Sequence, residues 1–212
     1  MPLLLSCAVI GCPLFILVFL IEGATRRSGY RPFRHPVSSL SLGPHGWVQK
    51  VNFLITGFLI TAFSFGLKLA LRHSEGGFWG PLFLGLVGMG LIGAGIFDTD
   101  PILGYPIGTP PIPTKWSFEG TLHNLSSLPV FLGIPAASFV FLNRFIVIGE
   151  WGWTIYSGLS GIGMLVFFVL AGKGFSGREG FVKIGGGFQR LSIGIGWTWV
   201  TLLGIHFLKG VI

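Results

Sequence analysis

Six long, uninterrupted apolar stretches dominate this sequence of 212 residues. They cover residues 3–21, 51–71, 78–97, 122–142, 151–171 and 191–208. Each is close to the ~20 residues that a helix needs to cross the hydrocarbon core of a bilayer. The pattern therefore predicts an all-α integral membrane protein, a six-transmembrane-helix bundle. Because the number of spans is even, both termini are expected on the same side of the membrane.

The composition excludes several other classes of protein. Hydrophobic residues make up 51% of the chain and charged residues only 10%, which is unlike a soluble domain. The apolar runs are continuous rather than alternating, so a transmembrane β-barrel is not predicted. The connecting segments are too short for a separate soluble domain, and residues 1–212 are expected to form a single transmembrane domain. Since a basic groove needs an exposed folded surface, no nucleic-acid partner is expected.

The connecting segments differ in length and charge. Those after the first, third and fifth spans, residues 22–50, 98–121 and 172–190, are long and lie on one side, here called the long-loop face. They carry ten of the 14 Lys and Arg residues: Arg26, Arg27, Arg31, Arg34, Lys50, Lys115, Lys173, Arg178, Lys183 and Arg190. The positive-inside rule predicts that this face is cytoplasmic and that both termini are outside.

Two spans have a distinctive texture. The third contains Gly85, Gly88, Gly90, Gly93 and Gly95, which favours a central helix in close contact with its neighbours. The alternative is a glycine-lined channel or cofactor groove. The fourth span contains Pro129 and Pro135; proline tends to kink a helix, and such kinks could open a cavity beside His123.

Chemically capable side chains gather on the long-loop face. His35, Ser38, Asp98 and His123 are candidate catalytic residues, with Asp98 orienting His123 as a base and Ser38 or Ser39 as the group it activates. His35, His45, His123 and Asp98 are candidate metal ligands, of which zinc would require three or four in tetrahedral geometry. His123 and His206 are also single histidines that could ligate a metal centre or a pigment.

A structural interpretation of the same residues is preferred. A polar network is predicted from Arg31, Arg34, Asp98, Asp100, Gln189 and Arg190, in which the carboxylates pair with the arginines and cap helix ends. Satisfied polar networks at helix junctions are commoner than catalytic sites. The Gly- and Pro-rich segment 104–113 cannot be helical and is expected to lie across the long-loop face as a lid or a contact strip.

Four short motifs occur on this face: HPxS-L at residues 35–40, FxxDP at 97–101, GxxH at 120–123 and GxxQR at 186–190. In combination they resemble an uncharacterised prokaryotic family of six-span membrane proteins, known only as a domain of unknown function. The resemblance implies a six-helix fold in the inner membrane and no established activity. More distantly, the arrangement is similar to eukaryotic membrane proteins of the DRAM and Sfk type, which are linked to lipid organisation and autophagy.

A further, vaguer resemblance is to membrane hydrolases of the ceramidase and receptor type. Such enzymes set a Ser, an Asp and three His around zinc. The last span here lacks the paired HxxxH of that pattern, which weakens the zinc interpretation.

The first functional hypothesis is a non-catalytic accessory or scaffold subunit of a larger membrane assembly, respiratory or photosynthetic for example. Its expected partners are membrane lipids and other membrane protein subunits; bound lipid is expected, and no cofactor is predicted. The alternative is a lipid-binding regulator or a metal-dependent lipid hydrolase using the His, Ser and Asp residues of the long-loop face. A small transporter is less favoured, because no Asp, Glu or Arg lies in the middle of a span.

Overall fold

The computed structural model describes residues 1–26, 29–72, 77–111 and 115–210. Within these ranges the chain forms six α-helices and one short 3-10 helix: α1 (Pro2–Thr25), η1 (Val37–Ser41), α2 (Gly46–Ala70), α3 (Trp79–Ile96), α4 (Phe118–Val147), α5 (Trp151–Phe175) and α6 (Gly185–Lys209). All six α-helices are long and apolar enough to cross a membrane. The predicted all-α bundle of six membrane helices is therefore confirmed. Arg27 and the end of the 104–113 segment lie outside the described residues.

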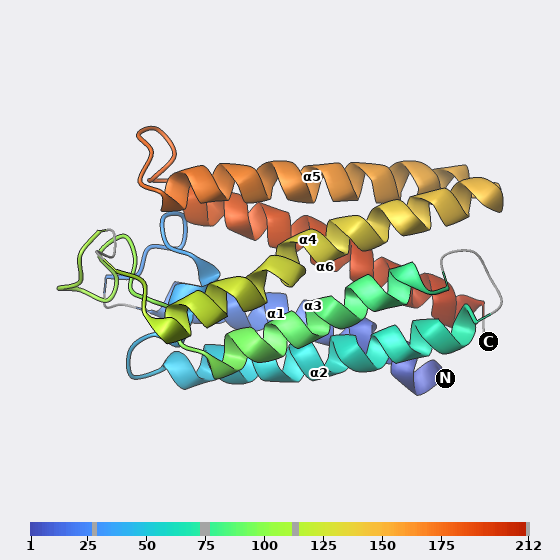
Figure 1. Ribbon diagram of the computed structural model, residues 1–212, viewed down its shortest axis with the longest axis horizontal. Helices are drawn as coiled ribbons and strands as arrows, with labels where there is room; N and C mark the ends of the chain where they lie inside the picture. The colour runs from blue at the N-terminus through green and yellow to red at the C-terminus, as the bar shows by residue number, and fades with distance from the viewer. Residues whose placement is uncertain (27–28, 73–76, 112–114, 211–212) are drawn as a thin grey trace.

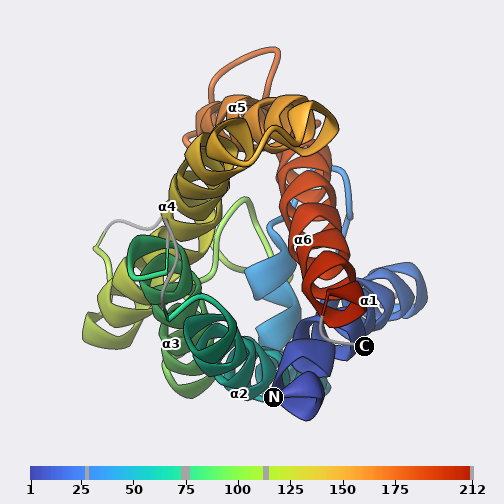
Figure 2. The same cartoon turned by 90° about the vertical axis from the view of Figure 1, so that its right-hand side faces the viewer.

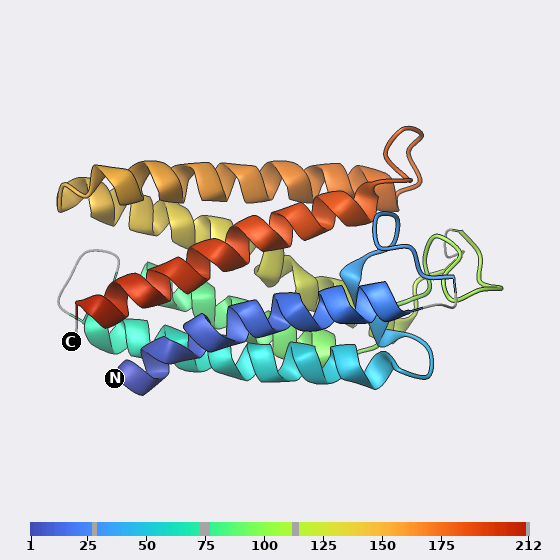
Figure 3. The same ribbon diagram turned by 180° about the vertical axis from the view of Figure 1, so that it is seen from behind.

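The six helices form a closed ring. Each helix packs against the one before and the one after it in the chain, and α6 returns to pack against α1 (Figure 2). Seen from behind, α6 runs diagonally from α5 at one end to α1 at the other (Figure 3). Alternation of direction around the ring places the long loops at one end, and the start of α1 and the end of α6 at the other (Figure 1).

Glycine residues bring neighbouring helices of the ring into backbone contact. A Cβ added at Gly57 of α2 would lie 2.8 Å from the carbonyl oxygen of Gly88 in α3, and one at Gly88 would lie 2.7 Å from that of Gly57. On the other side of α3, a Cβ at Gly90 would lie 2.5 Å from the carbonyl oxygen of Ser126 in α4. The close contacts predicted for the third span are present, but α3 is part of the wall of the ring rather than a central helix. Its glycines face its neighbours.

Helix α4 changes direction near its middle (Figure 1). Pro129 and Pro135 lie inside it, and each removes a backbone donor and crowds the preceding turn. The half of α4 after the bend follows α5, whereas the half before it follows α3. The bend therefore separates α4 from α5 at the long-loop end.

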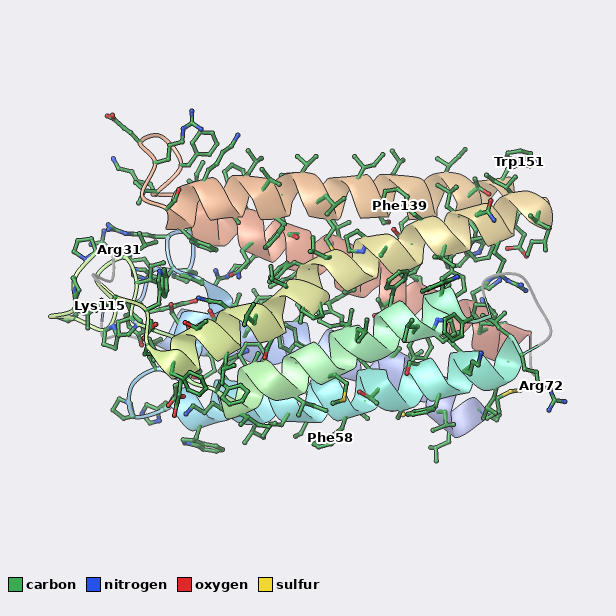
Figure 4. The ribbon with its side chains drawn as sticks, viewed as in Figure 1. Arg31, Phe58, Arg72, Lys115, Phe139 and Trp151 are labelled. Atoms are coloured by element: carbon green, nitrogen blue, oxygen red, sulfur yellow. The ribbon has the colours of Figure 1, made fainter. Side chains whose placement is uncertain are left out.

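Aromatic side chains fill the ring at the opposite end. Phe141 of α4 is fully buried; its ring lies 5.9 Å from that of Trp199 and 5.8 Å from that of Phe207 in α6, between centroids. The Nε1–H of Trp199 donates to Ser157 Oγ at 3.0 Å, so this buried indole is satisfied. Outside, exposed apolar residues such as Phe58 and Trp151 point away from the bundle (Figure 4), as a lipid-facing surface requires.

Candidate functional site

A cavity of about 290 Å³ lies inside the ring towards the long-loop end. Every helix contributes an apolar side chain to its wall: Phe15, Phe53, Ala94, Phe131, Phe168 and Trp197. Polar side chains occupy a smaller part of the wall: Ser38, Thr99, Asp100, His123, Asn124, Ser127 and Gln189. The cavity that the prolines of α4 predicted beside His123 is present.

The FxxDP and GxxH motifs contact each other at the start of α4. The Asp100 carboxylate accepts a hydrogen bond from the Ser117 backbone N–H at 2.9 Å, and a Cβ added at Gly120 would overlap that carboxylate. Ser117 Oγ in turn accepts from the Gly120 N–H at 2.9 Å. An anionic group at a helix N-terminus is favourable. Ser117 is therefore the N-cap of α4, and the missing side chain of Gly120 leaves room for the Asp100 carboxylate that binds the Ser117 N–H.

The His123 ring makes a second contact between the GxxH and FxxDP motifs. Its Nδ1 lies 3.0 Å from the backbone oxygen of Phe97. Since a carbonyl oxygen only accepts, Nδ1 carries the hydrogen of the neutral imidazole and Nε2 is left as an acceptor. Nε2 is buried and has no hydrogen-bond partner among the described residues. His123 thus places an unused acceptor in the cavity wall.

The HPxS-L and GxxQR motifs contact each other in a similar way. Gln189 Oε1 accepts from the Val37 N–H at 2.7 Å, and Arg190 Nη1 donates to the His35 backbone oxygen at 3.2 Å and to that of Pro32. A Cβ added at Gly186 would overlap those same carbonyl groups. The start of α6 therefore packs directly against residues 32–35, the turn that precedes η1.

His35 has both ring nitrogens in use. Nδ1 accepts from the Arg31 backbone N–H at 2.9 Å, and Nε2 lies 3.3 Å from the Leu103 backbone oxygen, to which it donates. Burial lowers the pKa of His35, and the neighbouring charges of Arg34, Arg31 and Arg190 lower it further. The side chain is a neutral link between two loops, with no free lone pair for a metal ion or a proton.

Arg26 is a central contact that the motif analysis missed. Its guanidinium donates to the backbone oxygens of Leu42 at 2.9 Å and Leu40 at 3.0 Å, and pairs with Glu22 at 2.5 Å. It also donates to the buried Tyr105 hydroxyl at 3.3 Å. The sequence could have indicated the ion pair, because Glu22 and Arg26 are four residues apart on one helix. It could not have indicated the bonds to backbone oxygens, because every residue has one. Arg26 holds η1 in place against α1.

The predicted pairing of the aspartates with arginines is corrected by the structure. Asp98 pairs with Lys50 of α2, and Asp100 lies at the start of α4. Arg190 is instead bound to backbone oxygens and to the Tyr30 hydroxyl at 2.6 Å, because the loop segment 30–37 fills the space beside it. The side chain that caps α4 is that of Ser117, and the Asp100 carboxylate accepts from the backbone N–H of that N-cap residue.

The candidate catalytic and metal residues are not gathered in one place. Ser38 and His123 share the cavity wall, whereas His35 and Asp98 do not belong to it. His45 is exposed at the start of α2. Within the described ranges, no three His, Cys, Asp or Glu side chains form a group that could hold a metal ion.

His206 lies near the end of α6, at the end of the bundle opposite the cavity. Its Nε2 is 3.6 Å from Glu150 Oε2, and its ring is 4.8 Å from that of Trp153 and 5.5 Å from that of Phe145, between centroids. Of the two histidines proposed as single ligands, His123 lines the cavity described above, and His206 does not.

In the described part of the segment 104–113, residues 104–111, Tyr105 is buried whereas Ile107, Gly108, Pro110 and Pro111 are exposed. Leu103 N–H donates to the Pro111 oxygen at 2.7 Å, and Tyr105 is buried against Tyr30, with ring centroids 5.2 Å apart. Preceding residues Thr99, Asp100 and Ile102 line the cavity. Residues 104–111 do not line the cavity, so the lid and the contact strip both remain predictions for this segment.

Comparison with known proteins identifies the family of the chain. Residues 9–206 match the family described as Protein of unknown function (DUF998). No curated protein and no solved structure matches the chain significantly. The match covers all six helices in whole or nearly so, and the resemblance inferred from the four motifs agrees with it. The chain therefore belongs to the DUF998 family of proteins of unknown function.

Proposed function

We propose that this protein is a non-catalytic membrane protein that binds a lipid in the cavity of its helix ring. The observation that carries the proposal is the cavity itself, about 290 Å³ in volume and walled mainly by apolar side chains from all six helices. Sites for small apolar ligands have this character, with volumes from about 300 Å³ upward and a few polar groups that fix orientation. The volume suits part of a lipid, such as a segment of chain.

The polar part of the wall favours an uncharged group that can donate hydrogen bonds. His123 offers the unpaired Nε2 acceptor, and Asp100 adds a carboxylate. A buried acceptor without a partner is costly, by about 1–3 kcal/mol, and a ligand hydroxyl would satisfy it. A lipid with a hydroxyl near its apolar chain matches this combination.

The cavity lies next to the lipid-facing surface. A shallow depression on the outside of α4 is lined by Trp116, Thr121, Asn124, Leu125 and Leu128. Trp116, Asn124 and Leu128 also line the cavity. Because the two hollows share these three side chains, a lipid chain could reach the cavity from the bilayer by a short displacement of Trp116.

The hydrolase alternative is less well supported by the positions of its residues. A nucleophile needs an adjacent base, and the base needs a group that orients it. His123 is oriented by the backbone oxygen of Phe97 and Asp98 pairs with Lys50, so Asp98 does not serve as its orienting carboxylate. Binding without turnover requires none of these relationships.

The proposal is tested by filling the cavity. Ala94→Phe introduces a ring at a cavity-lining position of α3, and Ile96→Phe, at a position 60% exposed on the same helix, is the matched control. Lipids that copurify in mild detergent are identified by native mass spectrometry. We expect Ala94→Phe to lose a lipid that the wild type and Ile96→Phe retain. A correctly folded Ala94→Phe variant with the wild-type lipid complement would refute the proposal.

An accessory role in a larger assembly is a second proposal. Helix α5 is the least buried of the six and presents an apolar stripe formed by Ile155, Leu159, Ile162, Val166 and Val169. Such a stripe could contact another membrane subunit as well as lipid. The mass and composition of the particle extracted from the native membrane test it: defined partner chains support an accessory subunit, and a particle of this chain with lipid alone contradicts one.

A further inference from the structure

A second pocket, of about 410 Å³, lies outside the ring at the long-loop end. It is lined by Tyr30, Arg31, Pro32, Phe33, Arg34 and Lys183, and is called the basic pocket below. Figure 4 shows Arg31 at this end of the bundle. Three of the six lining side chains are cationic and none is acidic. The basic pocket shares no residue with the cavity of the ring.

The backbone of the basic pocket is held in place by α6. The Gly187 N–H donates to the Phe33 oxygen at 2.9 Å, and the N–H groups of Arg34 and His35 both donate to the Arg31 oxygen, at 2.9 and 2.8 Å. Lys183 comes two residues before α6 begins. The three cations therefore lie on a turn and on the segment before α6, and these two parts are joined by backbone hydrogen bonds.

The cations of the basic pocket have unused capacity for binding. Arg34 Nε is buried and has no hydrogen-bond partner among the described residues. Arg31 and Lys183 are exposed. Clustered like charges repel one another, and a buried guanidinium N–H without an acceptor costs free energy. An anion in the pocket would reduce the repulsion, and it would satisfy Arg34 Nε if that side chain turned towards it.

The geometry points to the phosphate group of an anionic membrane lipid as the ligand of the basic pocket. A guanidinium group binds phosphate through directed N–H donors, and lysine adds a point charge. Phe33 is 71% exposed and the adjoining Ile184 is 42% exposed, which places apolar side chains beside the cations. Free phosphate would make no use of them, whereas a lipid brings its chains to that position. Basic pockets beside membrane helices are one kind of site at which acidic lipid head groups bind.

The test is a titration of the purified protein in an uncharged detergent with phosphatidylglycerol, followed by native mass spectrometry. Arg31→Gln with Lys183→Gln removes two exposed cations from the basic pocket. Lys115→Gln with Arg178→Gln removes two exposed cations outside it, so the net charge of the two double variants is equal. Phosphatidylcholine, which has a phosphate but no net charge, is titrated in parallel.

We expect the dissociation constant for phosphatidylglycerol to rise about fivefold per pocket cation removed and to change less than twofold in the control. Arg34→Lys, which keeps the charge but loses Nε, should also weaken binding. Equal binding by the two double variants would overturn the inference. So would pocket-dependent binding of inorganic phosphate, measured by calorimetry, without pocket-dependent binding of the lipid. Neither result would affect the cavity, which Ala94→Phe tests separately.

Discussion

Substitution of Gly120 by alanine tests the contact between the FxxDP and GxxH motifs. The added methyl group would overlap the Asp100 carboxylate, which would have to leave the start of α4. The carboxylate would lose its hydrogen bond from the Ser117 N–H, now 2.9 Å long. A hydrogen bond to a charged group contributes about 1.5–3 kcal/mol, and the helix-terminus interaction about 0.3–1 kcal/mol.

The higher helix propensity of alanine opposes this loss of unfolding free energy. Alanine is a better helix former than glycine by up to about 1 kcal/mol in a helix interior, and by less near the N-terminus. The net loss of unfolding free energy for Gly120→Ala is therefore about 1–3 kcal/mol. Gly152→Ala is the matched control, because Gly152 lies in the first turn of α5 and a Cβ there would meet nothing within 4 Å.

Reversible unfolding by denaturant in mixed detergent micelles measures the difference. Gly120→Ala should be less stable than the wild type, and Gly152→Ala should be equal to it or slightly more stable. Asp100→Ala should make the Gly120→Ala substitution nearly harmless in the double variant, because the overlapping group is gone. If the two alanine variants were equally stable, the close approach of Asp100 to α4 would be refuted.

Three other predictions concern the long-loop end. Gln189→Leu should lower the unfolding free energy by about 1–3 kcal/mol, because the buried Val37 N–H loses its acceptor, whereas Gln189→Glu, which keeps an acceptor, should cost less in the same assay. The pKa of His35 is lower in the folded protein than in the unfolded chain, so the unfolded chain binds a proton first as the pH falls. The melting temperature should therefore fall below pH ~6.5. The fall should be smaller in His35→Gln. For orientation, Lys115→Cys should resist a membrane-impermeant thiol reagent in intact cells and Arg72→Cys, at the other end (Figure 4), should react; the reverse pattern would contradict a cytoplasmic long-loop face.

Hydropathy alone was enough to predict the six helices, because the bilayer sets their length and composition. The closed ring was not predictable in this way. Hydropathy does not specify which helix faces which, and the contact between α1 and α6 joins segments far apart in the sequence. The glycines of α3 correctly indicated close packing, but their pattern could not distinguish a helix in the wall from one at the centre.

The candidate site was predicted in part for a similar reason. Pro129 and Pro135 act locally on α4, so the cavity beside His123 followed from the sequence. The pairing of charges did not, since Lys50 and Asp98 are distant in the chain and meet only because α2 and α3 pack together. Arg26 was missed because most of its partners are backbone oxygens of residues 40–45, for which no side-chain pattern exists.

The unequal filling of the ring has a consequence for lipid exchange. Around Phe141 and Trp199 aromatic side chains pack closely, and the cavity described above lies towards the long-loop end. A lipid bound there, as proposed, would enter from the leaflet on the long-loop side. Its binding would then report the composition of that leaflet, because the aromatic packing stands between the cavity and the other end of the bundle.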